Sequence, residues 1–232
     1  MGTLYVIATP IGNLEDITLR AIRVLREVNL IACEDTRVTR HLLDHYEIKT
    51  PTVSYFQHSK LSKIDYLVEQ LRQGKNVALV SDAGTPGISD PGQALIGYLR
   101  QELPEVAVLP IPGPSAVAAA ASVAGTIEKE FYFAGFLPKK KGRQTKFKML
   151  SKLETPIVIY ESALRLERTL SDIQSHFGDE VEIFIAREMT KMFEEYWTGR
   201  ISEVIRDLSN HKLKGEVVLI VGHGGAKQAE GD

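Results

Sequence analysis

The sequence is poor in cysteine and in long apolar stretches. It holds one cysteine, Cys33, in 232 residues, which excludes an internal disulfide and a cysteine-based metal site. No run reaches the roughly 18 consecutive apolar residues of a membrane span. The start MGTLYVIATP has neither the basic region nor the small-residue cleavage site of a signal peptide. We therefore expect a cytoplasmic protein that does not enter a membrane and in which Cys33 is a small buried hydrophobe.

Excess charge of either sign is also missing. Lys and Arg number 28 and Asp and Glu 30, a net charge of −2, so no overall field selects a partner. The apolar fraction of 44% and the charged fraction of 25% are typical of a globular protein. A polyanionic partner would therefore have to meet a local basic patch.

Several common active-site motifs are absent. There is no P-loop motif, no G-x-G-x-x-G after the first expected strand, and GISDPG does not match the nucleophile elbow G-x-S-x-G. His41 and His45 lie one turn apart on an expected helix, but a pair without a third ligand is typical of a solvated helix face. We expect no metal site, and the sequence gives no support for covalent catalysis.

Short apolar runs alternate with helical patterns along the chain. This alternation predicts the α/β class, with a mostly parallel sheet covered by helices. The second half has more strand, so we expect a mixed sheet with antiparallel pairs there. The expected strands are 3–8, 30–33, 76–81, 106–111, 131–135, 156–160, 181–186 and 216–221, and the expected helices are 17–28, 38–46, 62–75, 93–103, 115–124, 166–177 and 202–209.

We expect two α/β domains. The first covers residues 1–112 and the second 113–225, with the boundary near Pro112–Ser115, where the PGPS stretch interrupts the pattern. Residues 226–232 are predicted to form a disordered tail.

Four loops of the first half follow expected strands. The carboxyl ends of strands are where open α/β sheets bind ligands. The loops carry small residues and carboxylates but almost no cation, and VSDAGTPGISDPG holds three glycines and two prolines. A phosphate site would recruit Lys or Arg, so the composition favours a neutral or cationic ligand held by the main chain. Each loop alone is also consistent with a structural turn. The loops are 8–16, 33–39, 80–92 and 111–116.

Eight motifs occur in order from residue 3 to about residue 222: VIATPIGNLEDIT, CEDTRVTRHLL, SDAGTPGISDPG, PGPSA, FAGFLPKKK, YES, AREMTK and GEVVLIV. Together they resemble the tetrapyrrole methylase superfamily of S-adenosylmethionine-dependent enzymes. Within it they are similar to the branch that methylates a cytidine 2′-hydroxyl in the decoding centre of 16S rRNA, in the small ribosomal subunit.

The resemblance implies a two-domain α/β enzyme, usually a homodimer, that binds S-adenosyl-L-methionine in a cleft between its domains. One departure concerns the substrate: the family commonly has Pro-His after YES, where this chain has Ala163-Leu164. The positions that match the family's cofactor-binding residues are Pro10, Asp82, Ala83, Gly84, Ile88, Ser115, Ala116, Phe136, Leu137, Glu161 and Ala186.

Methyl transfer from a sulfonium is an in-line displacement, so positioning is the main catalytic device. Proton removal from a ribose hydroxyl adds to the rate. We favour the segment Glu34–Asp35–Arg37, in which a carboxylate accepts the proton and the arginine meets an RNA phosphate. Each carboxylate alone is also typical of a helix cap or a salt bridge. The candidates for base or positioning group are Glu34, Asp35, Arg37, Glu161, Glu188 and Lys191.

A basic segment, KKKGRQTKFK (139–148), holds six Lys or Arg residues and no acid. It predicts contacts to an RNA backbone, although the pattern alone also fits a solvated loop. Phe136 and Tyr160 are candidates to stack on a base, and equally to belong to the core or the cofactor wall. The predicted RNA contacts are Lys139, Lys140, Lys141 and Arg143.

Two other functions remain open. The first is methylation of a corrin or porphyrin precursor, whose carboxylates would also suit a lysine-rich flank. The second is a non-enzymatic RNA-binding module that has kept the fold. Binding of S-adenosylmethionine separates the enzymes from the module, and binding of small-subunit RNA against a tetrapyrrole separates the two enzymes.

Overall fold

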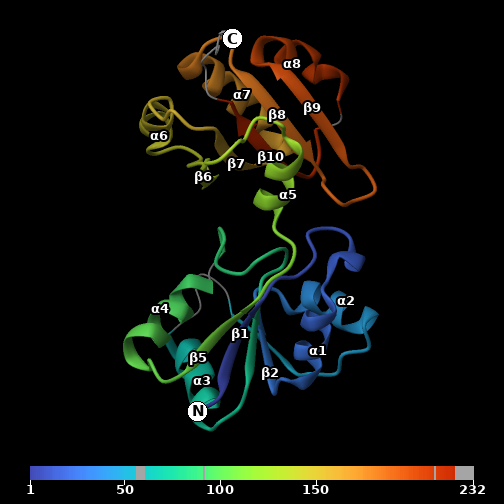
Figure 1. The fold of residues 1–232 in the computed structure, drawn as a ribbon, viewed down its shortest axis with the longest axis vertical. Coiled ribbons are helices and arrows are strands. Elements are labelled where there is room, and N and C mark those ends of the chain that lie inside the picture. The colour runs from blue at the N-terminus through green and yellow to red at the C-terminus, as the bar shows by residue number, and fades with distance from the viewer. Residues whose placement is uncertain (56–60, 91, 212, 223–232) are drawn as a thin grey trace, which may run out of the picture. The chain divides into compact units, whose positions relative to one another are not determined.

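The computed structural model describes residues 1–55, 61–90, 92–211 and 213–222 (Figure 1). The chain divides into two units, Met1–Ser115 and Ala116–Asp232, and each contains one five-stranded sheet. The predicted disorder of 226–232 concerns a segment outside the described residues.

The sheet of unit 1 is entirely parallel. Its strands are β1 (Thr3–Ile7), β2 (Leu30–Cys33), β3 (Thr52–Ser54), β4 (Val77–Val80) and β5 (Ala107–Ile111), in the order β3-β2-β4-β1-β5. The prediction of a mostly parallel first sheet is therefore confirmed. The sequence pattern missed β3, which has only three residues.

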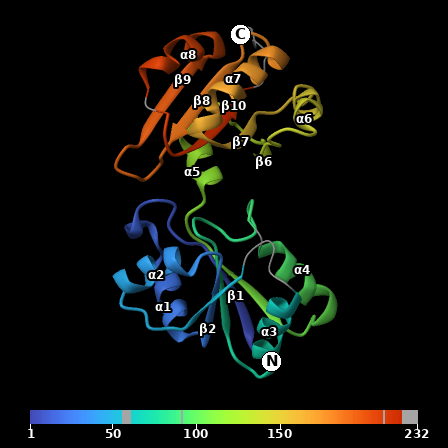
Figure 2. The ribbon, with the colours of Figure 1, turned by 180° about the vertical axis from the view of Figure 1, so that it is seen from behind.

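Helices cover both faces of this sheet. They are α1 (Leu19–Glu27), α2 (Thr36–His45), α3 (Leu61–Arg72) and α4 (Gly92–Glu102), after a short 3-10 turn η1 (Leu14–Asp16). Figures 1 and 2 show α1 and α2 on one side of the strands and α3 and α4 on the other. Strand β2 explains why two layers are needed. Its Ile31 and Cys33 pack with α1 and α2, whereas Leu30 and Ala32 pack with α3 and α4, because successive side chains leave opposite faces of a strand.

The sheet of unit 2 is mixed. Its strands are β6 (Tyr132–Phe136), β7 (Ile157–Ser162), β8 (Glu182–Arg187), β9 (Glu195–Arg200) and β10 (Glu216–Val221), in the order β6-β7-β10-β8-β9. Only the β6–β7 pair is parallel among the described strand pairs of this sheet, which confirms the predicted mixed sheet. Strand β9 was not predicted.

The two faces of the second sheet carry different helices. Helices α6 (Arg143–Leu150), α7 (Ala163–Phe177) and α8 (Ile201–Asp207) pack on one face. Helix α5 (Ala116–Val123) packs on the other. A 3-10 turn, η2 (Leu208–Asn210), follows α8. Helix α6 lies in the basic segment, where the sequence predicted no helix. It is anchored by Arg143, Phe147 and Leu150, all buried, and a buried arginine does not register in an apolar pattern.

In the part of the chain that the structure describes, no helix combines the length and the apolarity that a bilayer crossing would need.

Candidate active site

The loop after β4 is bonded to the loops that follow β1 and β2. The main chains of Thr9 and Gly84 exchange two hydrogen bonds, of 2.9 and 3.0 Å. The N–H of Asp35 donates to Oδ1 of Asp82 at 2.9 Å. Because these strands are parallel, their carboxyl ends meet at one edge of the sheet. The predicted gathering of these loops at one edge is therefore confirmed.

A third contact ties in the loop after β5, since the Thr85 hydroxyl donates to the carbonyl of Pro114 at 3.1 Å. The loop after β4 is thus bonded to all three other loops, and we call it the hub loop. It is the glycine- and proline-rich stretch of the sequence. Six predicted cofactor residues lie on these loops: Pro10, Asp82, Ala83, Gly84, Ile88 and Ser115.

The hub loop has an unusual main chain. Gly84, Gly87 and Ser89 have φ values of 81°, 87° and 65°, in the left-handed region that side chains disfavour. Asp90 fixes the turn, because its Oδ1 accepts the N–H of Gly87 at 2.7 Å and that of Gly92 at 2.8 Å. The loop is therefore held in one shape by its own carboxylate rather than by a packed core.

Replacing Gly84 with alanine is expected to lower the free energy of unfolding by about 1–2 kcal/mol, because an L-residue is strained at this φ. A Cβ at Gly84 would also approach Ile11 Cγ2 to 3.3 Å. Gly97→Ala is the matched control. Gly97 lies inside α4, and a Cβ there meets no atom within 4 Å, so alanine should stabilise the protein by about 0.5–1 kcal/mol. Urea unfolding of both variants measures the contrast, and equal effects of the two substitutions would contradict it.

The pKa values of the carboxylates at this edge are shifted in opposite directions. Burial raises the pKa of Glu34, and the negative charges of Asp82, Asp90 and Asp35 raise it further. Burial likewise raises the pKa of Asp82. Asp35 is the opposite case, because hydrogen bonds from the side chain and the N–H of Arg37 hold its pKa to about 2. Of the predicted carboxylates here, Glu34 is thus the better proton acceptor near neutral pH.

Arg37 is placed to meet a partner. Its side chain is 88% exposed while Nη2 lies 2.6 Å from Oδ2 of Asp35. Asp35 also accepts the N–H of Arg37 at 2.8 Å as the N-cap of α2. The cap therefore aims a largely solvated guanidinium outward from the start of the helix.

In unit 2 the prediction that Arg143 contacts an RNA backbone is wrong. Arg143 is only 3% exposed. Its Nε lies 2.7 Å from Oδ2 of Asp172, Nη2 donates to the Thr169 hydroxyl at 2.8 Å, and Nη1 donates to the carbonyl of Pro138 at 3.2 Å. All three nitrogens of the guanidinium are therefore bonded within unit 2, where they link α6 to α7. Lys139, Lys140 and Lys141, which precede it, are exposed.

Glu161 belongs to the same buried network. It is 1% exposed, and its carboxylate accepts the N–H of Ser162 and the hydroxyl of Thr169, each at 2.8 Å, and pairs with Arg165 at 2.5 Å. All of these partners belong to unit 2, so the contacts give the side chain a structural role between β7 and α7. Its role as a cofactor contact or base stays a prediction beside this structural one.

Tyr160, on the same strand, was predicted with Phe136 to stack on a base or to belong to the core or the cofactor wall. Its hydroxyl accepts the N–H of Val117 at 2.9 Å, directly after Ala116 at the start of α5. Its ring also meets Phe136 edge-on, with centroids 5.6 Å apart, and Phe136 is 55% exposed. Tyr160 therefore contacts one predicted cofactor residue, Phe136, and the residue that follows another, Ala116. Two others, Leu137 and Ala186, are buried in the cores of unit 2.

Glu188 and Lys191 form an ion pair. Lys191 Nζ lies 2.9 Å from Glu188 Oε1 and 2.9 Å from Glu216 Oε2. Burial disfavours the charged form of both groups, but their hydrogen bonds and the attraction between opposite charges together outweigh it. The pKa of Glu188 is therefore lowered and that of Lys191 is raised. Both groups stay ionised near neutral pH, which suits a positioning role better than proton transfer. Glu188 has a φ of 51°, a strained conformation typical of functional segments.

The family model described as Tetrapyrrole (Corrin/Porphyrin) Methylases matches residues 3–205. The chain belongs to the tetrapyrrole methylase family. The α/β fold with one parallel and one mixed sheet agrees with this membership.

Curated tetrapyrrole methylase relatives share close to half of the sequence. A protein of Thermotoga maritima named ribosomal RNA small subunit methyltransferase I is 46% identical over 95% of this chain and 98% of its own length. Proteins of the same name from Synechocystis sp. and Bacillus subtilis are each 44% identical over 95% of this chain, and 79% and 75% of their own lengths are covered.

Solved structures of tetrapyrrole methylases are more distant. The cobalt precorrin-4 methyltransferase CbiF has a TM-score of 0.71 at 16% identity, covering 95% of this chain and 94% of its own. A uroporphyrin-III C-methyl transferase from Thermus thermophilus, complexed with S-adenyl homocysteine, has a TM-score of 0.67 at 17% identity, covering 95% and 97%. These likenesses show the fold.

Proposed function

We propose that this tetrapyrrole methylase transfers a methyl group from S-adenosyl-L-methionine to a cytidine 2′-hydroxyl of 16S rRNA, expected at nucleotide 1402. The observation that carries the proposal is the shared identity of 44–46% over 95% of the chain with ribosomal RNA small subunit methyltransferases I. The two solved methyltransferases of corrin and porphyrin precursors described above share only 16% and 17%. An RNA substrate is therefore favoured over a tetrapyrrole.

The loop edge of unit 1 fits the cofactor chemically. Residues 81–90 offer main-chain groups, small side chains and carboxylates, and no lysine or arginine. Such a lining suits a ligand with a cationic sulfonium and an amino group better than it suits a phosphate. When bound, the cofactor supplies the methyl group on that sulfonium. The residues proposed to bind it are Pro10, Asp82, Ala83, Gly84, Ile88 and Ser115 of unit 1 and Ala116, Phe136, Leu137, Glu161 and Ala186 of unit 2, with Tyr160 as a further candidate.

The candidate catalytic residues receive separate roles. Glu34, whose pKa is raised by burial, takes the proton of the 2′-hydroxyl. Arg37, held by Asp35, contacts an RNA phosphate. Glu188 and Lys191 position the substrate as an ion pair. In each case the assigned role follows from the protonation state and exposure of the group.

The test is to map ribose methylation of 16S rRNA in cells with and without this gene, and to repeat it with purified enzyme, cofactor and small subunits. We expect one cytidine 2′-O-methyl group to disappear with the gene and to return in the reconstituted reaction. An unchanged methylation map would refute the RNA proposal. Calorimetry with S-adenosyl-L-methionine tests the cofactor separately, since a non-enzymatic module would not bind it.

The exposed lysines give a further prediction. Lys140→Ala with Lys141→Ala should weaken RNA binding and reduce the slope of log affinity against log salt by roughly 0.7–0.9 for each lost phosphate contact. Lys49→Ala with Arg72→Ala, two exposed cations of unit 1, is the control and should leave the slope unchanged. Filter binding across a salt series measures both. The same slope in all variants would remove these lysines from the RNA contact.

The proposal extends to assembly and location. A substrate in the small ribosomal subunit implies a cytoplasmic enzyme, and the family resemblance favours a homodimer. Light scattering of the purified protein tests the second point, for which a monomeric mass is the contrary result.

A further inference from the structure

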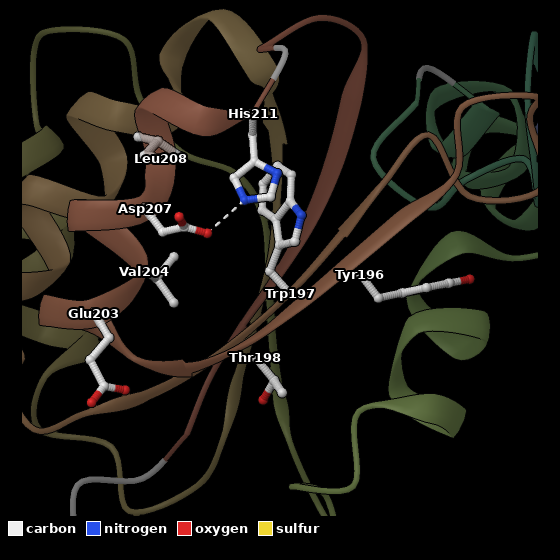
Figure 3. A pocket seen from close by; sticks show the side chains of 8 residues that line it. All are labelled: Tyr196, Trp197, Thr198, Glu203, Val204, Asp207, Leu208 and His211. Carbon is white, nitrogen blue, oxygen red and sulfur yellow. Dashed lines mark hydrogen bonds and ion pairs between the residues drawn. The ribbon is translucent and has the colours of Figure 1, made fainter.

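A cavity of about 340 Å³ opens in unit 2 beside β9, α8 and η2 (Figure 3). It lies outside the residues assigned to methyl transfer above. Val204 and Leu208, both buried, contribute apolar lining. Trp197 adds a large flat surface, while the side chain of Tyr196 points away from the other labelled residues. The cavity therefore has an apolar and aromatic base.

Its aromatic wall is built from two rings. Trp197 packs partly against the core of unit 2, and the His211 ring lies against it with centroids 4.2 Å apart at an angle of 48°. The Nε2 atom of His211 lies 2.9 Å from Oδ2 of Asp207, as the dashed line in Figure 3 shows. Both rings are thus held in place before any ligand binds.

The charges of the cavity are mainly negative. Hydrogen bonds from Asn210 and then His211 lower the pKa of Asp207, so this carboxylate is ionised at neutral pH. Glu203 is exposed, and its Oε2 receives only a long contact of 3.4 Å from the Arg200 N–H, as part of a helix-capping box. Its carboxylate therefore keeps most of its hydrogen-bonding capacity.

The side chains of two neighbouring arginines bind other groups and not the carboxylates of the cavity. The side chain of Arg200 pairs with Glu180 at 2.7 Å, and Nε of Arg206 donates to the carbonyl of Ser202 at 3.3 Å. Among the described residues there is no group of three side chains that could hold a metal ion. Two carboxylates also disfavour a phosphate. An organic cation is the ligand class that matches this lining.

We propose that the cavity binds the guanidinium group of an arginine side chain presented by another protein. A planar guanidinium packs against an aromatic wall such as that of Trp197 and His211 better than an ammonium does, and it forms paired hydrogen bonds with a carboxylate such as Glu203. Its methylene stem matches the apolar base of the cavity. Strand β9 is the last strand in the order of the described sheet, so an extended segment carrying the arginine can pair with its edge. The proposal does not rest on methyl transfer.

Trp197 makes the site directly observable, because it is the single tryptophan of the chain. The full-length protein is titrated with N-acetyl-arginine methylamide, with its uncharged citrulline counterpart, and with spermidine as a free polyamine. We expect a saturable change of Trp197 emission with the arginine compound, little change with citrulline, and weaker binding of spermidine. Glu203→Gln keeps the capping interaction, since glutamine also fits the capping box, but it should weaken arginine binding by about tenfold.

Glu167→Gln is the matched control, because Glu167 is exposed on α7 and does not line the cavity. It should leave the arginine affinity within about twofold of the unmodified protein. Equal binding of arginine and citrulline, spermidine binding as tightly as arginine, or unchanged affinity in Glu203→Gln would each overturn the proposal. So would the absence of any emission change. Affinity for S-adenosyl-L-methionine, measured in parallel, should be the same in both variants.

Discussion

Replacing Glu34 with glutamine is expected to slow methyl transfer by roughly 10²–10⁴-fold, the contribution typical of a general base. The loss should appear in kcat while the affinity for S-adenosyl-L-methionine, measured by calorimetry, stays the same. Glu105→Gln, an exposed carboxylate of unit 1, is the control and should retain full activity. A kcat for Glu34→Gln within about threefold of the unmodified enzyme would leave Glu34 without a catalytic role.

The same substitution should make the folded protein more stable at neutral pH. Burial raises the pKa of Glu34 above its ordinary value of 4.5, so the folded state holds this proton more tightly than the unfolded state does. Below pH 4.5 both states carry the proton and the residue costs nothing. As the pH rises through the raised pKa, the folded state must keep a partly buried charge and stability is lost. Glutamine avoids this loss.

The gain of Glu34→Gln should therefore appear above pH 4.5, remain below about 1 kcal/mol, and be full at neutral pH. Urea unfolding in acid and at neutral pH measures it. A gain that is larger in acid would contradict the direction of the shift. Higher stability together with lower activity is the pattern expected when a functional carboxylate is held among other negative charges and away from water.

Replacing Arg143 with methionine is expected to lower the free energy of unfolding of unit 2 by about 3–5 kcal/mol, the usual cost of removing one partner of a buried ion pair. Asp172 and the Pro138 carbonyl would lose their bonds to the guanidinium. Lys141→Met, an exposed neighbour, should change stability by less than about 0.5 kcal/mol. Chemical denaturation followed by Trp197 fluorescence reports on this unit.

A second variant separates a buried pair from simple loss of packing. Arg143→Met combined with Asp172→Leu removes both charges, so it should be more stable than Arg143→Met alone. If the double variant were the less stable of the two, the pair would not be the source of the effect. If Arg143→Met were as stable as Lys141→Met, the side chain would be on the surface, as the sequence had suggested.

The case of Arg143 shows what the sequence pattern could not supply. A run of six basic residues in ten predicts a solvated segment, and nothing in the run marks the one arginine that turns inward. Its partner Asp172 lies 29 residues further along the chain. Strand β9 was missed for a related reason, since its alternation mixes Glu195, Thr198 and Arg200 with two aromatic residues, and edge strands tolerate such polar residues.

The loops of unit 1 were more predictable. The alternation of strands and helices requires a parallel sheet, and a parallel sheet places the ends of its strands together. The hydrogen bond between Asp35 and Asp82 joins residues 47 positions apart. It depends on β2 lying beside β4, and strand order is not encoded in local periodicity. The residue types at this edge could thus be predicted from the sequence, whereas the hydrogen bonds that fix its geometry could not.

The buried thiol of Cys33 can report how often unit 1 opens locally. This thiol is 0% exposed within β2, and burial also raises its pKa, so an alkylating reagent can reach it only when the sheet transiently opens. The alkylation rate therefore counts opening events in the half of the molecule that lacks a tryptophan. Comparing that rate with and without S-adenosyl-L-methionine would show how far cofactor binding at the loops slows local opening of the sheet.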